Sequence, residues 1–303
     1  MAVVAMKRRQ NPRNGALENL LRGFSIEVMP RTAARIDDFR TLLPRGTRIY
    51  LAHIDGTPFD DMLATARRLS QQGFAVMPHF PARLIRDRAM LAEWIDRYRH
   101  EAGVDQALVL AGGVSQPQGA FDNSMEMLDT GLFDDLTRIH VAGHPEGNRD
   151  VAPNGAPGVL LDALRWKQDF ARRKGLEMAI VTQFAFESAP VIKWANSLVE
   201  AGITLPVHLG VAGPAKLQTL IRFAIACGVG PSLRVLQKRA RDVRKLLLPF
   251  APDDFLNDIA AHKAAHPDLN ISHIHFFPLG GIKAAAEWAR DHGGDTAQPD
   301  AQD

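Results

Sequence analysis

Residues 138–150 read RIHVAGHPEGNRD, an apolar, β-branched run that breaks abruptly into a histidine, a proline, a glutamate and several charged residues. The run is typical of a buried strand, and the break is typical of the loop that follows one. Seven further apolar runs of this kind recur along the chain, separated by longer amphipathic stretches. The eight expected strands are 24–29, 48–53, 74–80, 107–112, 138–143, 178–184, 205–210 and 273–278.

A helical pattern follows each of these runs. The expected helices are 32–43, 59–72, 87–102, 123–132, 158–175, 189–201, 214–228 and 282–292. Eight strands that each precede a helix predict an α/β fold, a (β/α)₈ TIM barrel. An open doubly wound sheet is the alternative, but no Gly-x-Gly-x-x-Gly fingerprint follows the first strand.

The barrel is expected to form one catalytic domain over residues 21–292. An extra helical insertion is expected between strands seven and eight, at about 229–267, because 232–248 and 253–266 both have helical periodicity. Residues 1–20 and 293–303 are expected to be a flexible N-terminal segment and a flexible tail.

Composition narrows the class of protein. With 303 residues, 46% of them hydrophobic, the chain can bury a substantial core. The 36 Lys and Arg against 34 Asp and Glu leave a net charge of +2, which gives no reason to expect a nucleic-acid or membrane partner. A single cysteine, Cys227, excludes an intrachain disulfide and fits a reducing compartment. No run of about 18 apolar residues and no secretory signal is found, so a cytoplasmic protein is expected.

Polar residues gather where the expected strands end. In a barrel these positions converge on one rim, which is where the chemistry of this fold is placed. Each residue alone could be a buried polar group bonded to backbone, but their number predicts a site at the rim. They are Glu27, His53, His79, Gly112, Gly113, His144, Glu146, Gln183, His208, His273 and His275.

A metal-dependent hydrolase is one interpretation of so many histidines, since imidazole is a common zinc ligand. The best-known metal hydrolases of this fold carry a His-x-His pair on the first strand. Here the pair is His273 and His275 on the last strand, and the first strand offers only Glu27. We therefore expect no metal.

Glu27 and Gln183 have more specific chemistry. Apolar residues flank Glu27 in FSIEVMP, so burial is expected to raise its pKa into the range of a general acid. A structural ion pair is the alternative. The Gln183 amide can donate and accept hydrogen bonds at once, which suits a heterocyclic substrate, although a core glutamine would look the same.

Six motifs, taken together, resemble the methylenetetrahydrofolate reductase family of flavin-dependent (β/α)₈ barrels. The resemblance spans about 24–279. The motifs, in chain order, are FSIEVMPRT (24–32), VMPHF (76–80), GHPEGNRD (143–150), AIVTQFAFE (179–187), AGITLPVHLGVAGPAKLQTLIRF (201–223) and IHFFPLG (274–280).

The resemblance implies a flavin-dependent oxidoreductase that interconverts 5,10-methylenetetrahydrofolate and 5-methyltetrahydrofolate, with FAD as cofactor and NADH or NADPH as co-substrate. It implies that Glu27 donates a proton to the folate, that Gln183 contacts the folate and that Phe223 stacks on it. Family members often associate, so a homo-oligomer is compatible with it. The cofactor-binding positions that it implies are His53, His79, Leu110, Ala111, Gly112, Gly113, Phe121, His144, Asn148, Asp162 and Lys167.

The sequence also departs from the family pattern. Leu110 to Gly113 read Leu-Ala-Gly-Gly where the family has Leu-Arg-Gly-Asp, while His144 and Asn148 replace a tyrosine and a histidine. Loss of a negative charge beside a flavin would raise its potential and favour methyl oxidation, as in a demethylation pathway. The alternatives are a flavin-poor or flavin-free member acting on folate or a related one-carbon substrate, and a non-catalytic folate-binding barrel.

Overall fold

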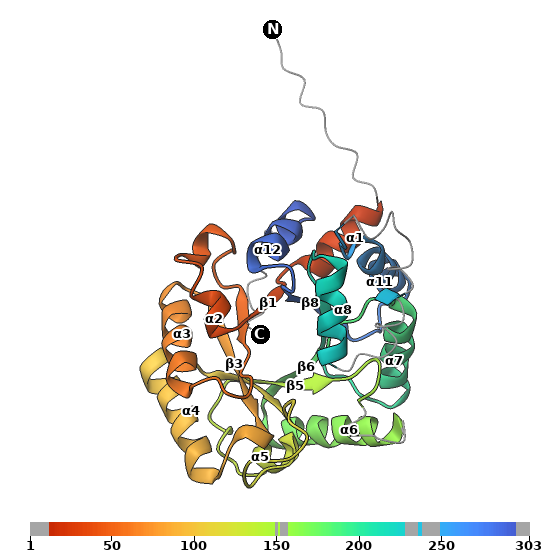
Figure 1. Cartoon of the computed structure of the whole chain (residues 1–303). Helices are drawn as coiled ribbons and strands as arrows, with labels where there is room; N and C mark the ends of the chain where they lie inside the picture. The colour runs from red at the N-terminus through yellow and green to blue at the C-terminus, as the bar shows by residue number, and fades with distance from the viewer. Residues whose placement is uncertain (1–11, 149–150, 152–156, 228–235, 238–248, 295–303) are drawn as a thin grey trace.

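The computed structural model describes residues 12–148, 151, 157–227, 236–237 and 249–294. Eight parallel strands pair in chain order, and the last pairs with the first, so the sheet closes into a barrel ringed by helices (Figure 1). The predicted fold class is confirmed. The strands are β1 Ser25–Val28, β2 Arg48–Leu51, β3 Ala75–Pro81, β4 Gln106–Leu110, β5 Arg138–Gly143, β6 Glu177–Thr182, β7 Val207–Ala212 and β8 Ile271–Phe277.

Helices follow the strands and cover the outside of the barrel. Their bounds are α1 Pro12–Leu21, α2 Pro30–Ala33, α3 Phe59–Gln71, α4 Arg88–Ala102, α5 Ser124–Leu128, α6 Pro157–Lys174, α7 Ser188–Glu200, α8 Leu217–Ala226, α11 Asp253–Ala265 and α12 Ile282–Asp291. Local chemistry sets some of these bounds. Asp87 accepts a hydrogen bond from the Met90 amide at 2.8 Å and starts α4, and Gly103, with φ of 64°, ends it.

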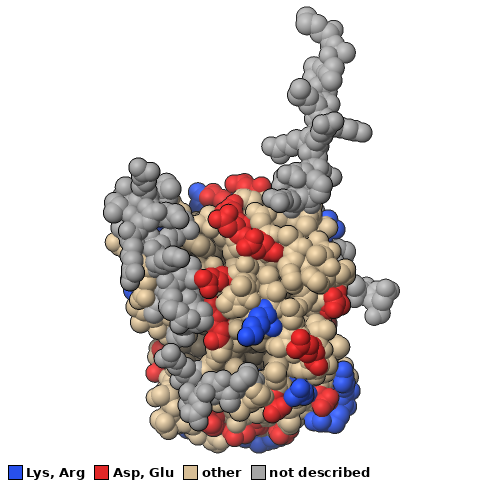
Figure 2. All heavy atoms as spheres, turned by 90° about the vertical axis from the view of Figure 1, so that its right-hand side faces the viewer, with Lys and Arg blue, Asp and Glu red and all other residues tan. Residues whose placement is uncertain are grey.

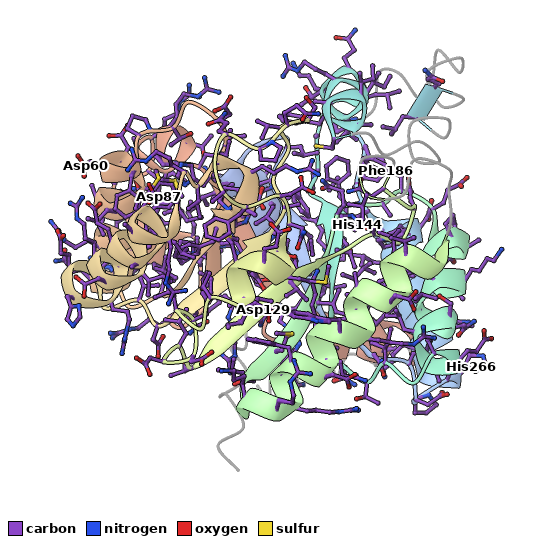
Figure 3. The ribbon with its side chains drawn as sticks, turned by 90° about the horizontal axis from the view of Figure 1, so that it is seen from below. Asp60, Asp87, Asp129, His144, Phe186 and His266 are labelled. Atoms are coloured by element: carbon purple, nitrogen blue, oxygen red, sulfur yellow. The ribbon has the colours of Figure 1, made fainter. Side chains whose placement is uncertain are left out.

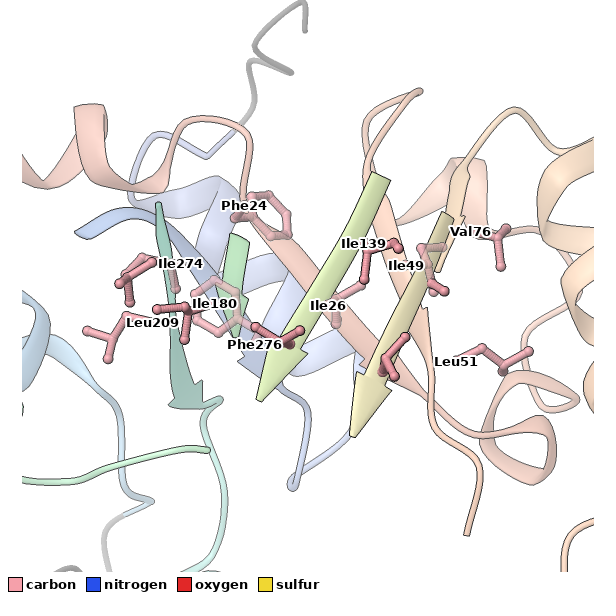
Figure 4. Close-up of a cluster of buried hydrophobic side chains, with 14 of the residues drawn as sticks. Phe24, Ile26, Ile49, Leu51, Val76, Ile139, Ile180, Leu209, Ile274 and Phe276 are labelled. Atoms are coloured by element: carbon pink, nitrogen blue, oxygen red, sulfur yellow. The ribbon is translucent and has the colours of Figure 1, made fainter. Parts of the chain in front are cut away.

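Successive side chains of each strand point alternately out of and into the barrel, so the strands contribute to two separate clusters of buried residues. Outward side chains such as Ile26 and Phe276 join the main hydrophobic core between the sheet and the helices (Figure 4). Inward side chains such as Tyr50 and Met77 form a smaller cluster inside the barrel. Each large apolar side chain buried in this way contributes about 1.5–3 kcal/mol to folding. The outward face of the strands is therefore apolar, whereas the inward face carries buried polar residues such as Ser25 and His140 beside this smaller cluster.

The expected helix over 32–43 is wrong. The chain forms the short α2 and then a single 3-10 turn, Phe39–Thr41. Asp38 accepts hydrogen bonds from the backbone and side chain of Arg40, which competes with helical bonding. The Arg68 guanidinium from α3 binds the carbonyl oxygens of Ala33 and Ile36, which a continuous helix would have used itself.

The seventh βα unit also differs from expectation. The helix α11, expected as part of the insertion, packs against α7 and α1 in the outer ring. The helix α8, expected to be the ring helix, packs instead on Phe184 and Phe186 from the end of β6. The other expected insertion helix, 232–248, lies outside the described residues except for Leu236 and Gln237.

The N-terminal helix belongs to the fold. Residues 1–20 were expected to be flexible, but the described part forms α1, whose Leu17, Leu20 and Leu21 are buried in the main core. At the other end, the Gly294 amide donates to the Ala289 carbonyl, so the described structure continues past the expected end of the domain at 292. Residues 295–303 lie outside the described part.

The face of the molecule shown in Figure 2 carries charges of both signs. On the side shown in Figure 2, acidic side chains and fewer basic ones are spread over a mostly uncharged surface. Among the described residues, none of the helices combines the length and the apolar character needed to cross a bilayer.

Gly210 on β7 marks a close approach between strands. A Cβ atom at this position would lie 2.3 Å from the Thr182 carbonyl oxygen and 2.8 Å from the Gln183 backbone. Both neighbours are main-chain atoms of β6 and the loop that follows it. A side chain at Gly210 would therefore push the two strands apart.

We expect Gly210→Ala to lower the free energy of unfolding by about 1–3 kcal/mol, because a main-chain clash cannot relax by rotating a side chain. Urea unfolding measures the loss. Gly158→Ala is the control, because a Cβ atom there meets nothing within 4 Å. A variant at Gly210 as stable as this control would contradict the close approach.

Candidate functional site

The centre of the site is a carboxylate between two imidazoles. Glu27 Oε2 lies 3.4 Å from His79 Nε2 and 3.8 Å from His275 Nε2. The three residues come from β1, β3 and β8, so barrel closure brings them together. Both distances exceed those of a direct charge-assisted hydrogen bond. Neither Nε2 atom has a closer hydrogen-bond partner among the described residues.

The expectation that burial gives Glu27 a raised pKa is wrong. Burial by itself would raise this pKa, but interactions with His275 and then His79 outweigh it and lower the pKa to about 2. The side chain keeps 20% of its surface exposed, so it still reaches the barrel mouth. Glu27 is therefore ionised at neutral pH and is not a stored acid; two imidazoles are its polar neighbours.

A layer of buried polar side chains lies beneath Glu27. Ser25 Oγ lies 2.9 Å from His275 Nδ1, and the Tyr50 hydroxyl lies 2.5 Å from His140 Nδ1. Burial lowers the pKa of His140 and His208 well below the usual value and raises the pKa of the Tyr50 phenol. These groups are therefore neutral, and the charges that act on them come from Glu27 above and from Arg48 and Arg138.

A metal is not indicated by the arrangement. Within the described ranges, no group of three or more histidine, cysteine, aspartate or glutamate side chains has a geometry that could hold a metal ion. His273 and His275, the His-x-His pair, are used separately: the His273 ring lies 4.6 Å from His208, and the His275 ring contacts Tyr50 at 4.4 Å.

Phenylalanines form the wall above Glu27. We define the mouth cluster as the second hydrophobic cluster of the structure, and it is centred on the ends of β6 to β8. The Phe277 ring of this wall contacts the His275 ring at 4.8 Å, which joins the wall to the polar floor. Its members are Phe184, Phe186, Ala212, Ala215, Leu217, Leu220, Ala224, Leu236 and Phe250, with Ile221, Phe223, Phe277 and Leu279 packed against them.

The structure places both expected folate-contacting residues at this mouth. Gln183 follows β6. Its backbone N–H donates to the Gly143 carbonyl, and its side-chain Oε1 accepts a hydrogen bond from the Phe184 backbone N–H at 3.2 Å. The side-chain NH₂ group of Gln183 has no hydrogen bond within the described residues. Phe223 lies on α8, half-buried, with the Arg222 guanidinium 5.6 Å from its ring centroid.

The loop after β4 is held by Arg83, a buried residue that sequence reasoning missed. Its Nε donates to the Asp122 carbonyl and carboxylate at 3.0 and 3.1 Å, and its Nη1 donates to the Val114 carbonyl at 3.0 Å. Its backbone bonds Ala111 and Gln118. In the sequence, nothing distinguishes this arginine from the exposed Arg86 three residues later.

The four residues of the Leu-Ala-Gly-Gly motif have separate environments. Leu110 packs on the cluster inside the barrel, and the Ala111 carbonyl accepts from the Arg83 amide. Gly112 has φ of 103°, which favours glycine, and a Cβ atom at Gly113 would meet nothing within 4 Å. The space beside Gly113 is therefore open.

His144 begins the loop after β5 and lies near Lys167 of α6. Figure 3 shows His144 beside α6, the helix that carries Lys167. Burial, and then the nearby Lys167, lowers the pKa of His144 to about 4, and burial lowers the pKa of Lys167 to about 8. Asn148 accepts a hydrogen bond from the Val151 amide at 3.2 Å, in the same loop.

Three residues expected at a cofactor have partners within the protein. Asp162 is exposed on the outer face of α6, in an ion pair with Arg165 at 2.7 Å. Phe121 is buried in the main core. The His53 ring stacks on Trp94 at 4.9 Å, and its Nε2 bonds the Thr57 carbonyl. Sequence position alone could not show which way these side chains face.

A cavity of about 650 Å³ lies at the opposite end of the barrel, between α1 and α11. Ile271 and Ser272, at the start of β8, line it together with Lys263. The Lys263 ammonium already bonds the carbonyls of Pro267 and Leu269. The cavity is therefore separate from Glu27, and the Lys263 ammonium that lines it is hydrogen-bonded to backbone carbonyls of the protein.

Comparisons with known proteins show the fold. No protein-family model matches the chain. A solved structure of an uncharacterised protein from Clostridium thermocellum, which binds two copies of 5-methyl-5,6,7,8-tetrahydrofolic acid, is similar with a TM-score of 0.55 and 11% identity, covering 91% of this chain and 97% of that one. A 2,3-dimethylmalate lyase of the PEP mutase/isocitrate lyase superfamily gives a TM-score of 0.45 and 11% identity over 92% of this chain and 84% of that one.

We expect Glu27→Gln to remove part of the pH dependence of stability. A carboxyl whose pKa falls from 4.5 to about 2 on folding stabilises the fold above pH 4.5, and this contribution is lost as the pH falls through about 2. The full shift corresponds to about 3 kcal/mol. Urea unfolding of wild type and variant between these pH values measures the difference. A difference that stays constant with pH would contradict the lowered pKa.

We expect Arg83→Met to loosen the loop after β4, because three hydrogen bonds to loop oxygens are lost while the stem is kept. Hydrogen exchange of the amides over 111–122 should speed up by about tenfold or more, as for the loss of about 1.5–3 kcal/mol of charged hydrogen bonding. Arg86→Met, which removes an exposed ion pair to Asp87, is the matched control. Equal exchange in both variants would mean that Arg83 does not hold the loop.

Proposed function

We propose that the barrel mouth binds a reduced folate and that the chain interconverts 5,10-methylenetetrahydrofolate and 5-methyltetrahydrofolate, with NADH or NADPH as hydride partner. The observation that carries the proposal is the ionised Glu27, held between His79 and His275 beneath a phenylalanine wall. A reduced folate combines a flat ring with nitrogen atoms that gain and lose protons. The ring suits the wall, and the nitrogen atoms suit the carboxylate.

Two independent findings support a folate as the ligand. The six motifs that resemble the methylenetetrahydrofolate reductase family occur in order along the chain. The Clostridium thermocellum protein that shares the barrel fold binds 5-methyltetrahydrofolic acid. The first concerns residues and the second concerns architecture, so they do not depend on each other.

Glu27 exchanges a proton with the folate in this proposal. In the methyl-forming direction a folate nitrogen gains a proton, so Glu27 must hold one before it can donate. In the opposite direction the carboxylate accepts the proton directly. His79 and His275 stabilise the ionised form between turnovers, which is the form with the lowered pKa.

Gln183 and Phe223 orient the folate ring. The carbonyl oxygen of the Gln183 side chain is already used by the Phe184 amide, so its NH₂ group is the part that binds the ligand. It would donate to an acceptor on the edge of the pterin. Phe223 extends the wall from α8 and offers a face for stacking.

The residues expected around FAD fit such a cofactor only in part. His144 and Lys167 lie together, whereas Asp162 faces solvent and Phe121 is buried in the core. Gly113 leaves open space where the family has a carboxylate. We therefore assign the hydride to the nicotinamide co-substrate and propose a flavin-poor or flavin-free member.

We expect Glu27→Gln to slow conversion of 5-methyltetrahydrofolate with NAD⁺ or NADP⁺ by about 10²–10⁴-fold, because the group that takes the proton is lost. Binding of the folate should change far less, because glutamine keeps the size of the side chain. Absorbance of the reduced nicotinamide measures the rate, and calorimetry measures binding. Glu200→Gln, at the exposed end of α7, is the control.

Two outcomes would contradict the proposal. Failure of wild type to bind 5-methyltetrahydrofolate at millimolar concentration would remove the folate site itself. Binding without turnover would leave the non-catalytic folate-binding barrel. The visible spectrum of the purified protein tests the cofactor assignment, since the absorption of about one flavin per chain would contradict a flavin-poor or flavin-free protein.

A further inference from the structure

A line of buried polar side chains begins directly under Glu27. The Nε2 atom of His275 faces Glu27 Oε2 at 3.8 Å, and its Nδ1 atom lies 2.9 Å from Ser25 Oγ. The strand register accounts for this, because Ser25 and His275 are paired positions of β1 and β8. One imidazole therefore connects the carboxylate and the hydroxyl through its two nitrogen atoms.

Tyr50 continues the line. Its hydroxyl lies 2.5 Å from His140 Nδ1, and Tyr50 on β2 is paired with Glu27 of β1, the strand that also carries Ser25. Its ring packs edge-on against His275, with centroids 4.4 Å apart. His275, Ser25, Tyr50 and His140 are each at most 1% exposed. Bulk water therefore does not reach the line from its sides.

The charge on Glu27 sets the direction of the hydrogen bond between His275 and Ser25, and a relay toward Glu27 requires the same direction at Tyr50 and His140. A carboxylate only accepts, so His275, which burial keeps neutral, carries its proton on Nε2 and accepts from Ser25 at Nδ1. The Ser25 oxygen can then accept a proton from Tyr50. In the relay, the Tyr50 oxygen accepts the Nδ1 proton of His140, so that all donors point toward Glu27.

We propose that this line is a proton relay that supplies Glu27 from the base of the barrel. Its members, in order from Glu27, are His275, Ser25, Tyr50 and His140. The inference rests on the proposed function, because Glu27 needs a supply only if a folate nitrogen takes its proton. A bound folate would also separate Glu27 from solvent at the mouth, which leaves the interior as the route.

The transfer moves protons and no electrons. The Nε2–H bond of His275 breaks as an O–H bond forms on Glu27, and each following O–H or N–H proton shifts one place in the same direction. His140 loses its Nδ1 proton and gains one at Nε2. The 3.8 Å gap between Glu27 and His275 exceeds hydrogen-bond range by about 0.6 Å, so closing it starts the transfer.

Two more imidazoles lead from His140 toward the base. The His208 ring lies 4.7 Å from His140, and the His273 ring lies 4.6 Å from His208. His273 is partly exposed, at the start of β8, whereas His208 is buried. The Nδ1 atom of His208 has no hydrogen-bond partner among the described residues, so it can take up and pass on a proton.

The test compares Tyr50→Phe and Ser25→Ala with wild type in the reduction of 5,10-methylenetetrahydrofolate by NADH or NADPH. We expect kcat to fall by about tenfold to a hundredfold, with the KM for folate unchanged, because only proton supply is interrupted. The defect should shrink as the pH is lowered, since direct protonation of Glu27 by the solvent then becomes faster. A merely structural defect would not recover in acid.

Tyr98→Phe is the matched control. Tyr98 is the only other tyrosine of the chain, and its buried hydroxyl, in the outer core, has no hydrogen-bond partner within the described part. We expect wild-type kcat in this variant. If Tyr50→Phe and Ser25→Ala match it at every pH while wild type turns folate over, the relay is overturned and the proposed function stands.

A second measurement needs no turnover. Nitrogen-15 NMR of the histidine rings in the intact protein should show His275 protonated at Nε2 and His140 protonated at Nδ1 at neutral pH, with resonances assigned from single histidine substitutions. The opposite tautomer at either ring would overturn the relay. If wild type does not act on folates but both tautomers are as expected, the proposed function fails while the hydrogen-bonded line stands.

Discussion

The structure of the site depends on the ionised carboxylate of Glu27 being held inside a closed barrel. A buried charge is costly unless it is paired and hydrogen-bonded, and here the compensation comes from His79 on β3 and His275 on β8. The second imidazole reaches Glu27 only because β8 pairs with β1. Closure of the sheet therefore also brings His275 to the charge on Glu27. The pairing register of β1 and β8 places Ser25 opposite His275 in the polar layer beneath.

The barrel could be predicted because its signal is local. Each strand is a short apolar run and each helix an amphipathic one, and all eight strands fall within a few residues of expectation. The secondary-structure predictions fail where contacts with residues distant in the sequence determine the local structure. Arg68 from α3 takes the carbonyls that a helix over 32–43 would have used. The exchange of places between α8 and α11 likewise depends on packing, since both are periodic in sequence.

The gathering of polar residues at one end of the barrel was predictable, and their electrostatics was not. Position at a strand end brought Glu27, His79 and Gln183 to one mouth, as expected for parallel strands. The pKa of Glu27 was not predictable from its apolar flanks, because His275 lies at the other end of the chain. Asp162 matched a motif, but the helix turns it to the solvent. Arg83 gave no signal, because burial distinguishes it from Arg86 and composition does not.

Because of the placement of α8, the shape of the barrel mouth and the packing of the outer ring of helices depend on different helices. This helix packs on the mouth cluster, while α11 fills the outer ring beside α7 and α1. Substitutions on α8 therefore reshape the wall of the barrel mouth and leave the packing between α11, α7 and α1 unchanged. The shape of the mouth can change in descendants of this chain at little cost to folding, and grafting of this helix between barrels of the same fold is a route to a differently shaped mouth.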